Sequence, residues 1–361
     1  MISDGTFLGC PISYESEGGV LYLGNYAMGY ETSWQNSNLV IREGTTTVSS
    51  NAFSTFSGSI QLPSTLVGLP SFSNHQYLQR VILPEGIESI PRNMFRGCSN
   101  LVEVTIPTSV KSIGYFAFNG CNQLLQIENG VSYVGKWAIS ADATLTSVTL
   151  RADTVGIAEF CFWRSAITSI DLPEGLRYIS EIAFMSCTGL TELTIPASVE
   201  YIGGNPLHYC SNVSRVVVAD GNTAYHVANG FLIETATKTV LWGLDPRELP
   251  TDGSVTAIKE AFAGMSYRLP EITELVLPES IVRIDTEAFC DATALVRITL
   301  SGDLEYIGLN VFYGCEALTD IDFGGTMAEW EAVEKSEHWI QNYHKLTIHC
   351  TDGDIVIGTS N

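Results

Sequence analysis

The stretch LPEGIESIPRNMFRGCSNLVEVTIP at residues 83–107 decides the fold, because the same phrase returns along the chain. It comes back as IPTSVKSIGYFAFNGCNQLLQI at 106–127, LPEGLRYISEIAFMSCTGLTELTIP at 172–196 and LPESIVRIDTEAFCDATALVRITL at 277–300. Repeats with a length in the low twenties are typical of a solenoid, in which every turn is one short supersecondary unit. No turn can bury its apolar side alone, so each turn needs its neighbours.

One aromatic position gives the length of the repeat. It begins at Phe53 and, over most of the chain, recurs every 19–23 residues. The longer step from Leu207 to Phe262 predicts an insertion at about 219–250, and Gly264–Leu269 lengthens the next turn by about four residues. We therefore predict about eleven turns of about 23 residues. The position is occupied by Phe72, Phe95, Phe118, Ile139, Phe162, Phe184, Leu207, Phe262, Phe289 and Phe312.

Each turn is predicted to hold a short strand followed by a compact apolar segment. Val104 and Ile106 alternate with Thr105, which is the period of a strand. Pro107 ends this strand, because proline has no N–H for the next ladder bond. Phe116–Phe118 then buries its rings in a short helical or 3₁₀ segment. The chain is therefore expected to be α/β by class and dominated by strands.

The repeat resembles a known family. The pattern L-x-x-L-x-I-P-x-S-V-x-x-I-G-x-x-A-F-x-x-C is similar to the BspA-like leucine-rich repeat of bacterial cell-surface proteins, and Leu101–Cys121 and Thr191–Cys210 match it nearly position for position. The resemblance runs from about Asn38 to Phe323. It implies a right-handed leucine-rich-repeat solenoid with hairpin insertions and a C-terminal helix-hairpin cap. Known members are mostly exported and some are adhesins that bind host matrix proteins, so it also implies a non-catalytic recognition module.

We expect one solenoid domain over residues 1–361, with a cover at each end. Its parts are an N-terminal hairpin cap at 1–37, repeats at 38–323 with an insertion at about 219–250, and a C-terminal cap at 324–361. GGVLYLGNYAMGY at 18–30 resembles the inserted hairpin of the family, and GGTMAEWEAVEKSEHW at 324–339 resembles its C-terminal cap.

Three hairpins and one helix are predicted outside the regular repeats. Val20–Leu23 and Tyr26–Met28 read as one hairpin around Gly24-Asn25, and 230–233 and Thr239–Trp242 read as another. In the C-terminal cap, Thr326 and Glu329 have the spacing of a capping box, which predicts a helix over Met327–Trp339. A final hairpin is predicted over Leu346–Cys350 and Ile355–Ile357.

Composition excludes several classes of protein. Eighteen basic and forty acidic residues give a formal charge of −22, and an anionic surface of that size repels nucleic acid and acidic membranes. No run approaches the length of a membrane-spanning helix. We therefore expect a monomer that binds neither nucleic acid nor membrane, and the family resemblance implies a location outside the cell or on its surface. Met1–Cys10 lacks the pattern of a signal peptide, so we expect an export signal to have been removed; a cytoplasmic protein is the alternative.

Five of the nine cysteines occupy one slot of the repeat, three residues after the aromatic position. Ser165, Ala292 and His75 fill the same slot in other turns, so the slot favours a small side chain and we predict packed free thiols. An odd total argues against complete disulfide pairing, and no C-x₂-C pair exists for zinc. The five are Cys98, Cys121, Cys187, Cys210 and Cys315.

No catalytic pattern is present in the sequence. It has no G-x-S-x-G, no H-E-x-x-H, no phosphate loop and no EF-hand loop. His338, His344 and His349 gather near the C-terminus, where we interpret them as surface and cap residues. The sequence therefore predicts no enzyme activity, no cofactor and no metal site.

The concave face of the solenoid is the first candidate for partner binding. Two rows of outward positions flank the inward residue of each strand, and together they are rich in acidic side chains and hold no aromatic ring. With ten strands about 4.8 Å apart, this face would run roughly 45 Å, which suits an extended partner. The candidate binding residues on it are Arg80, Glu103, Gln126, Glu192, Arg215, Glu274 and Arg297.

The two insertions are the second candidate, because insertions into a solenoid often carry its binding site. Their aromatic residues are expected mainly to pack on the solenoid, with Trp34 and Trp242 as exposed contacts in the alternative. The predicted function is an adhesin-like surface or secreted module that binds a protein such as a host matrix protein. A structural spacer or assembly element without a soluble ligand remains the alternative, and an enzyme or glycan-processing accessory is a third interpretation.

Overall fold

The computed structural model describes residues 14–260, 262, 271–340 and 345–358. Strands carry nearly all regular structure in these residues and build a β-solenoid of about fourteen turns, which confirms the predicted fold class and exceeds the predicted eleven turns. The described chain forms two compact units. The first holds the residues up to Ala141 together with Thr154–Cys161 and Tyr178–Ser180, and the second holds the rest. The predicted single domain with its caps stays a prediction.

Each turn begins with a long strand that pairs in parallel with the long strands of adjacent turns. On β7 (Leu78–Ile82), Val81 is buried while Arg80 and Ile82 are exposed, which is the expected period of two. In the first unit the order is β4 (Asn38–Val40), β6 (Gly58–Gln61), β7 and β9 (Glu103–Thr105). In the second unit β14 (Ser147–Thr149) pairs with β16 (Ser169–Asp171), β18 (Glu192–Ile195) with β20 (Arg215–Val218), and β25 (Glu274–Val276), β27 (Arg297–Leu300), β29 (Asp320–Phe323) and β31 (Leu346–Cys350) form one series.

A second ladder is made by two-residue strands that follow the long ones. Each of them except β30 (Glu334–Lys335) contributes one inward aliphatic side chain, such as Ile90, Ile113 or Ile284. In the first unit these strands are β5 (Thr47–Val48), β8 (Ser89–Ile90), β10 (Ser112–Ile113), β15 (Gly156–Ile157) and β17 (Tyr178–Ile179). In the second unit they are β19 (Tyr201–Ile202), β24 (Ala257–Ile258), β26 (Arg283–Ile284), β28 (Tyr306–Ile307) and β30 (Glu334–Lys335).

The predicted aromatic position forms a third ladder. The N–H of Phe95 donates to the C=O of Ala117 at 2.8 Å, and the N–H of Phe289 donates to the C=O of Val311 at 3.1 Å. The rings of Phe95 and Phe118 stack with centroids 5.3 Å apart and an angle of 11° between their planes. Truncating one such buried ring costs about 3–5 kcal/mol, so the stack is a principal part of the core.

In most turns with a stacked residue, the residues two positions before and two positions after it have a left-handed backbone. Asn and Gly fill many of these sites, as expected for positive φ. The earlier position is held by Asn93, Phe116, Phe160, Ile182, Asn205, Glu260, Glu287 and Asn310. The later position is held by Asn74, Gly97, Gly120, Arg164, Ser186, Tyr209, Asp291 and Gly314.

The cysteine slot is confirmed as a row of free thiols. The Sγ–H of Cys121 donates to the C=O of Phe95, the stacked residue of the preceding turn, at 3.0 Å. Cys98, Cys187 and Cys210 make the same bond at 2.9–3.0 Å. Burial raises the pKa of the Cys315 thiol to about 12, so this thiol stays protonated and unreactive at neutral pH.

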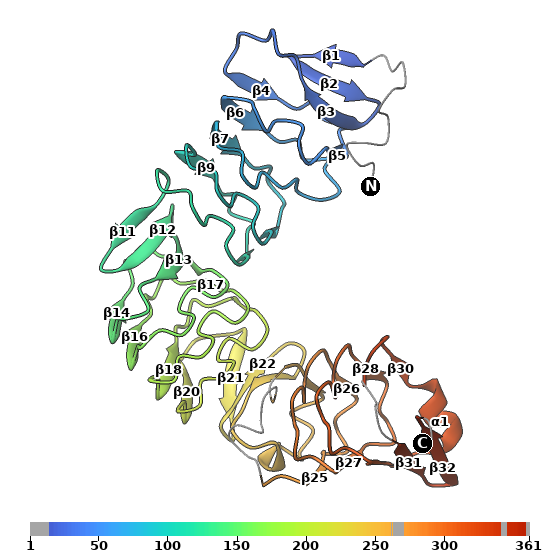
Figure 1. Ribbon diagram of the computed structural model, residues 1–361. Coiled ribbons are helices and arrows are strands. Elements are labelled where there is room, and N and C mark those ends of the chain that lie inside the picture. Colours follow the sequence, from blue (N-terminus) through green and yellow to red (C-terminus); the bar gives the residue numbers. More distant parts are fainter. Residues whose placement is uncertain (1–13, 261, 263–270, 341–344, 359–361) are drawn as a thin grey trace. The chain divides into compact units, whose positions relative to one another are not determined.

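Antiparallel hairpins join the second ladder at three places in the described residues. The two predicted hairpins are confirmed, one over β2 (Val20–Leu23) and β3 (Tyr26–Tyr30), the other over β22 (Phe231–Glu234) and β23 (Thr239–Trp242). A further strand precedes each, β1 (Glu15–Glu17) in the first and β21 (Tyr225–Ala228) in the second, and β1, β2 and β3 lie side by side (Figure 1). The last strand of each hairpin continues in parallel, β3 with β5 and β23 with β24.

The third hairpin corrects the predicted register. Residues 126–141 form β11 (Gln126–Glu128), β12 (Val131–Val134) and β13 (Trp137–Ala141) instead of a regular turn. Ile139 therefore lies half-buried on β13 and is not part of the aromatic stack. Ile127 is 73% exposed, because β11 pairs with β12 rather than adding to the long strands.

The C-terminal cap has a shorter helix than predicted. Thr326 and Glu329 form the expected capping box, but α1 ends at Ala332 after starting at Met327. Val333 has an extended backbone and the next residues form β30, which pairs with β28, so the ladder of short strands replaces the rest of the helix. The final hairpin is confirmed as β31 and β32 (Gly353–Ile357), with α1 beside β32 (Figure 1).

Candidate functional site

The long strands place most of the predicted binding residues in one register. Arg80 lies opposite Glu103, and Arg215 lies opposite Glu192. Arg297 lies between Glu274 and Asp320. Gln126 does not belong to this row, because β11 pairs with β12, so the predicted face of ten continuous strands is interrupted there. The other predicted residues share what we call the strand face, the outward side of the long strands within each unit.

The arginines of the strand face are paired with neighbouring carboxylates. Arg80 Nε lies 3.0 Å from Glu103 Oε2, and Arg215 Nη1 lies 3.2 Å from Glu192 Oε2. Arg297 contacts Asp320 at 3.3 Å and Asp322 at 2.7 Å. Exposed pairs of this kind stabilise a fold by about 1 kcal/mol or less. The three arginines of the strand face therefore have their charges neutralised by neighbouring carboxylates.

The two predicted tryptophans pack on the solenoid. Trp242 is 2% exposed, so its selection as a partner contact was wrong: β23 lies in the sheet that continues into β24, which buries its side chains. Trp34 is half-buried and its indole covers Gly19, where an added Cβ would overlap the ring. The expectation that the aromatic residues of the insertions pack inward is confirmed for Trp242, Tyr22 and Tyr225, which are all buried.

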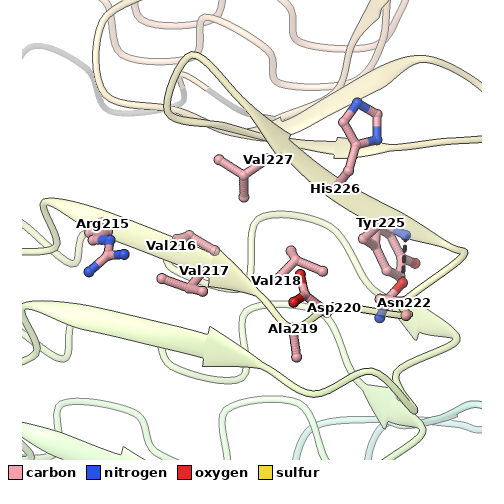
Figure 2. Close-up of a pocket in the computed structure, with 11 residues that line it drawn as sticks. Arg215, Val216, Val217, Val218, Ala219, Asp220, Asn222, Tyr225, His226 and Val227 are labelled. Carbon is pink, nitrogen blue, oxygen red and sulfur yellow. Dashed lines mark hydrogen bonds between the residues drawn. The ribbon is translucent and has the colours of Figure 1, made fainter.

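A groove lies where the second insertion leaves the strand face (Figure 2). It is formed by β20, the loop 219–222 and the start of β21, and its volume is about 450 Å³, within the range of ligand sites. Figure 2 shows Arg215 at one end of a row of valines, with Asn222 and Tyr225 toward the other end. Of the predicted binding residues, Arg215 is thus shared by the strand face and the groove.

Two open strand edges border this groove. Among the described residues, β20 pairs only with β18, and β21 pairs only with β22. A 3₁₀ helix, η1 (Pro246–Glu248), follows β23 of the second insertion and contacts β25. Pro246 has no N–H for a ladder, and among the described residues η1 forms no strand pair with β20.

The end of the groove is held rigid by Asn222 and Tyr225. The Asn222 side-chain amide donates to the C=O groups of Pro196 and Val199, both at 3.0 Å, and its oxygen accepts the N–H of Tyr225 at 2.8 Å. The Tyr225 hydroxyl accepts the N–H of Ile202 at 2.7 Å, and burial raises the pKa of Tyr225. Both side chains are therefore occupied in shaping the groove before any ligand arrives.

The walls of the groove are apolar and its rim is charged. Val217 and Val218 are half-buried, and Val227 is 36% exposed on the opposite wall. The Asp220 carboxylate is exposed at the loop, and His226 contacts Thr235 Oγ1 at 3.0 Å. In the part of the chain that the structure describes, no three His, Cys, Asp or Glu side chains are gathered for a metal ion. The groove can therefore bind through apolar, charged and backbone contacts.

The family assignment follows from a comparison with known sequence families. The BspA type leucine rich repeat region matches residues 22–128, 123–227 and 256–333, with six copies. This chain is a BspA-type leucine-rich repeat protein. The BspA-type match includes β20 and the first residues of β21 and omits 228–255, where the rest of the insertion and η1 lie. The BspA-type repeat is a scaffold family, and the matched segments contain every long strand of the first unit.

Solved structures of other leucine-rich repeat proteins are similar to this BspA-type chain. A leucine rich cell surface protein from Faecalibacterium prausnitzii is 20% identical, with 90% of this chain and 98% of that chain covered and a TM-score of 0.38. The pneumococcal vaccine antigen PcpA is 17% identical, with 87% and 82% covered and a TM-score of 0.44. A leucine-rich repeat protein from Bacteroides ovatus is 17% identical, with 86% and 69% covered and a TM-score of 0.33.

No curated protein matches the chain. Among the described residues, no helix has the length and apolar character to cross a membrane.

Proposed function

We propose that this chain is a non-catalytic recognition module of the bacterial cell surface that binds a protein partner at the groove between β20 and β21. The observation that carries the proposal is a preformed groove with exposed valines and two open strand edges. Protein partners bury apolar side chains at the centre of an interface, and Val217 and Val227 offer such a centre. The similar Faecalibacterium protein is named a leucine rich cell surface protein, which supports the cell-surface location. Host matrix proteins are the first partners to test.

A solid-phase binding screen at physiological salt tests this proposal. The purified chain is presented with fibronectin, fibrinogen, collagen and mucin, and an unrelated acidic solenoid serves as the control protein. Saturable binding to one partner is expected. Val227→Lys should then weaken binding by about tenfold or more, because a charge replaces an apolar wall of the groove.

The matched control is Val276→Lys, which places the same charge on an exposed valine of β25 outside the groove lining. Equal losses in both variants would argue against the groove. A loss confined to charge reversal at Glu103, Glu192 and Glu274 would instead move the site to the strand face.

The competing function is a structural spacer or assembly element of the cell surface. Open strand edges favour it as well, because an unpaired edge can join another chain. No binding to the panel, together with concentration-dependent self-association in sedimentation experiments, would support the spacer and oppose the recognition module.

A further inference from the structure

We infer that the groove between β20 and β21 takes an extended segment of the partner protein as an added β-strand, and that this segment carries apolar and basic side chains. The inference rests on the proposed function and specifies the chemistry of its partner. Strand addition to an exposed sheet edge obtains affinity from main-chain hydrogen bonds and specificity from the pockets of alternate side chains.

The open edge of β20 has peptide groups that do not face β18. The N–H of Ala219 donates to the C=O of Ile195 at 2.9 Å, and the register pairs Arg215 with Glu192 and Val217 with Thr194. In a parallel ladder the N–H and C=O of one residue point to the same neighbour, and successive residues alternate sides. The peptide groups of Val216 and Val218 therefore point away from β18, toward the open side.

The open edge of β21 likewise has a peptide group that does not face β22. The N–H of Thr235 donates to the C=O of Ala224 at 2.9 Å, and His226 lies opposite Ile233 in the antiparallel register. Because residues of an antiparallel pair alternate between bonded and non-bonded positions, the peptide group of Val227 points away from β22. The two edges thus present donors and acceptors on the lining of the same groove, a pattern that another polypeptide backbone can match.

Charge and side-chain shape define the segment. Val217 and Val227 favour β-branched or other apolar residues as cross-strand neighbours. The exposed Asp220 lies at the loop, whereas Arg215, the cation of the groove, is already paired with Glu192 at 3.2 Å. With a formal charge of −22 on the whole chain, complementarity favours a segment with basic residues.

The test is a selection of random linear dodecapeptides, displayed on phage, on the full chain. We expect enriched peptides that alternate apolar and other residues and contain Lys or Arg. Val218→Pro should weaken their binding by about tenfold, because it removes an N–H that faces the groove and spares the pairing with β18. Val218→Thr keeps the N–H and the β-branched shape, so it should bind as the wild type does.

Three results would overturn the inference. These are the absence of enriched peptides, equal binding of the enriched peptides to the Val218→Pro variant, and enrichment of acidic peptides. Should Val218→Pro fail to fold, Val227→Lys tests the same groove on the opposite strand, and its loss of peptide binding is expected. A matrix protein that binds the wild type and Val218→Pro equally well would leave the recognition function standing while removing strand addition as its mode.

Discussion

At the scale of single residues, the solenoid depends on a backbone that L-amino acids adopt reluctantly. The left-handed positions on either side of the stacked residue recur from turn to turn, with φ near +60° at Asn93, Asn310 and Ser186. A β-branched residue in this region costs about 1–2 kcal/mol. Ile182 nevertheless has φ 45°, so its turn tolerates strain that the turns with Asn avoid.

Exchanging residues at this position should shift stability in opposite directions. Ile182→Asn should raise the free energy of unfolding by about 1 kcal/mol, because Asn relieves the strain and the side chain is only half-buried. Asn310→Ile should lower it by a similar amount. Chemical denaturation of both variants measures the two changes, and destabilisation by Ile182→Asn would show that packing outweighs strain at this site.

Glu260 occupies the same left-handed position and supplies a pH-dependent prediction. Burial raises its pKa to about 7, with Lys259 opposing and Glu181 adding to the shift. At pH 4 the carboxyl group is largely protonated in both states. As pH rises from about 4.5 to 7 the unfolded chain ionises first, so the folded state loses stability.

Glu260→Gln removes this loss. Relative to the variant, the wild type should lose on the order of 2 kcal/mol between pH 4.5 and 8. Thermal melts of both proteins across this range provide the measurement. A constant difference between the two melting curves would contradict the raised pKa.

At the scale of elements, the sequence predicted the regular turns well. It predicted poorly a hairpin that hardly changes the spacing between successive repeats. The stacked phenylalanines, the cysteine slot and two hairpins follow from local patterns. The step from Phe118 to Ile139 nearly equals one repeat, so counting did not reveal the hairpin at 131–141. The third hairpin could have been found from internal sequence similarity, because GVSYVGKWAI at 130–139 resembles GVLYLGNYAM at 19–28, the segment of the first predicted hairpin.

The groove was out of reach of periodicity for a different reason. It exists because β20 and β21 lie in different sheets, which is a tertiary property. One feature near the groove could have been predicted from the sequence. Pro246 lies where the repeat would place a strand, and a proline there predicts an interruption of the strand ladder. Gln126 was wrongly placed in the row of long strands because the register was extended through a segment that a hairpin occupies. Trp242 was chosen as an aromatic residue of the second insertion, and it is buried.

The terminal hairpin carries a histidine whose charge should stabilise the cap. His349 Nε2 lies 2.7 Å from Asp320 Oδ1 and Nδ1 lies 3.0 Å from Asp354 Oδ1, with Arg297 and Asp322 in the same network. The bond to Asp320, followed by that to Asp354, raises the pKa of His349. Its contribution is therefore complete below the ordinary pKa near 6.5 and is lost as pH rises through the raised value.

His349→Gln should accordingly differ most from the wild type in mildly acidic solution. We expect the melting temperature of the wild type to exceed that of the variant at pH 6 and to approach it at pH 9. Differential scanning fluorimetry at several pH values provides the measurement. If the wild type instead exceeded the variant by more degrees at pH 9 than at pH 6, the charged His349 would not be stabilising the cap through these ion pairs.

At the scale of the whole molecule, the excess of acidic residues should govern how fast a partner arrives. Opposite charge speeds association, and salt screens this effect over a Debye length of about 10 Å at 0.1 M. If the partner segment is basic, its association rate should fall by roughly tenfold between 0.05 and 0.3 M NaCl, while dissociation changes less. Surface plasmon resonance measures both rates, and an association rate that ignores salt would argue against a basic partner.

The hairpins also make this chain a practical carrier for foreign sequences. Their tips at Gly24-Asn25, Gly135-Lys136 and Thr235–Lys238 are exposed, and side-chain atoms added at Gly24 and Gly135 would meet no neighbour. Exposed loop tips with small or polar residues are the positions at which proteins most often tolerate inserted residues. An epitope or a fluorescent label grafted at Gly135 would thus be displayed at a known place on the hairpin, just before Lys136, whose C=O accepts the N–H of Val155 at 2.9 Å.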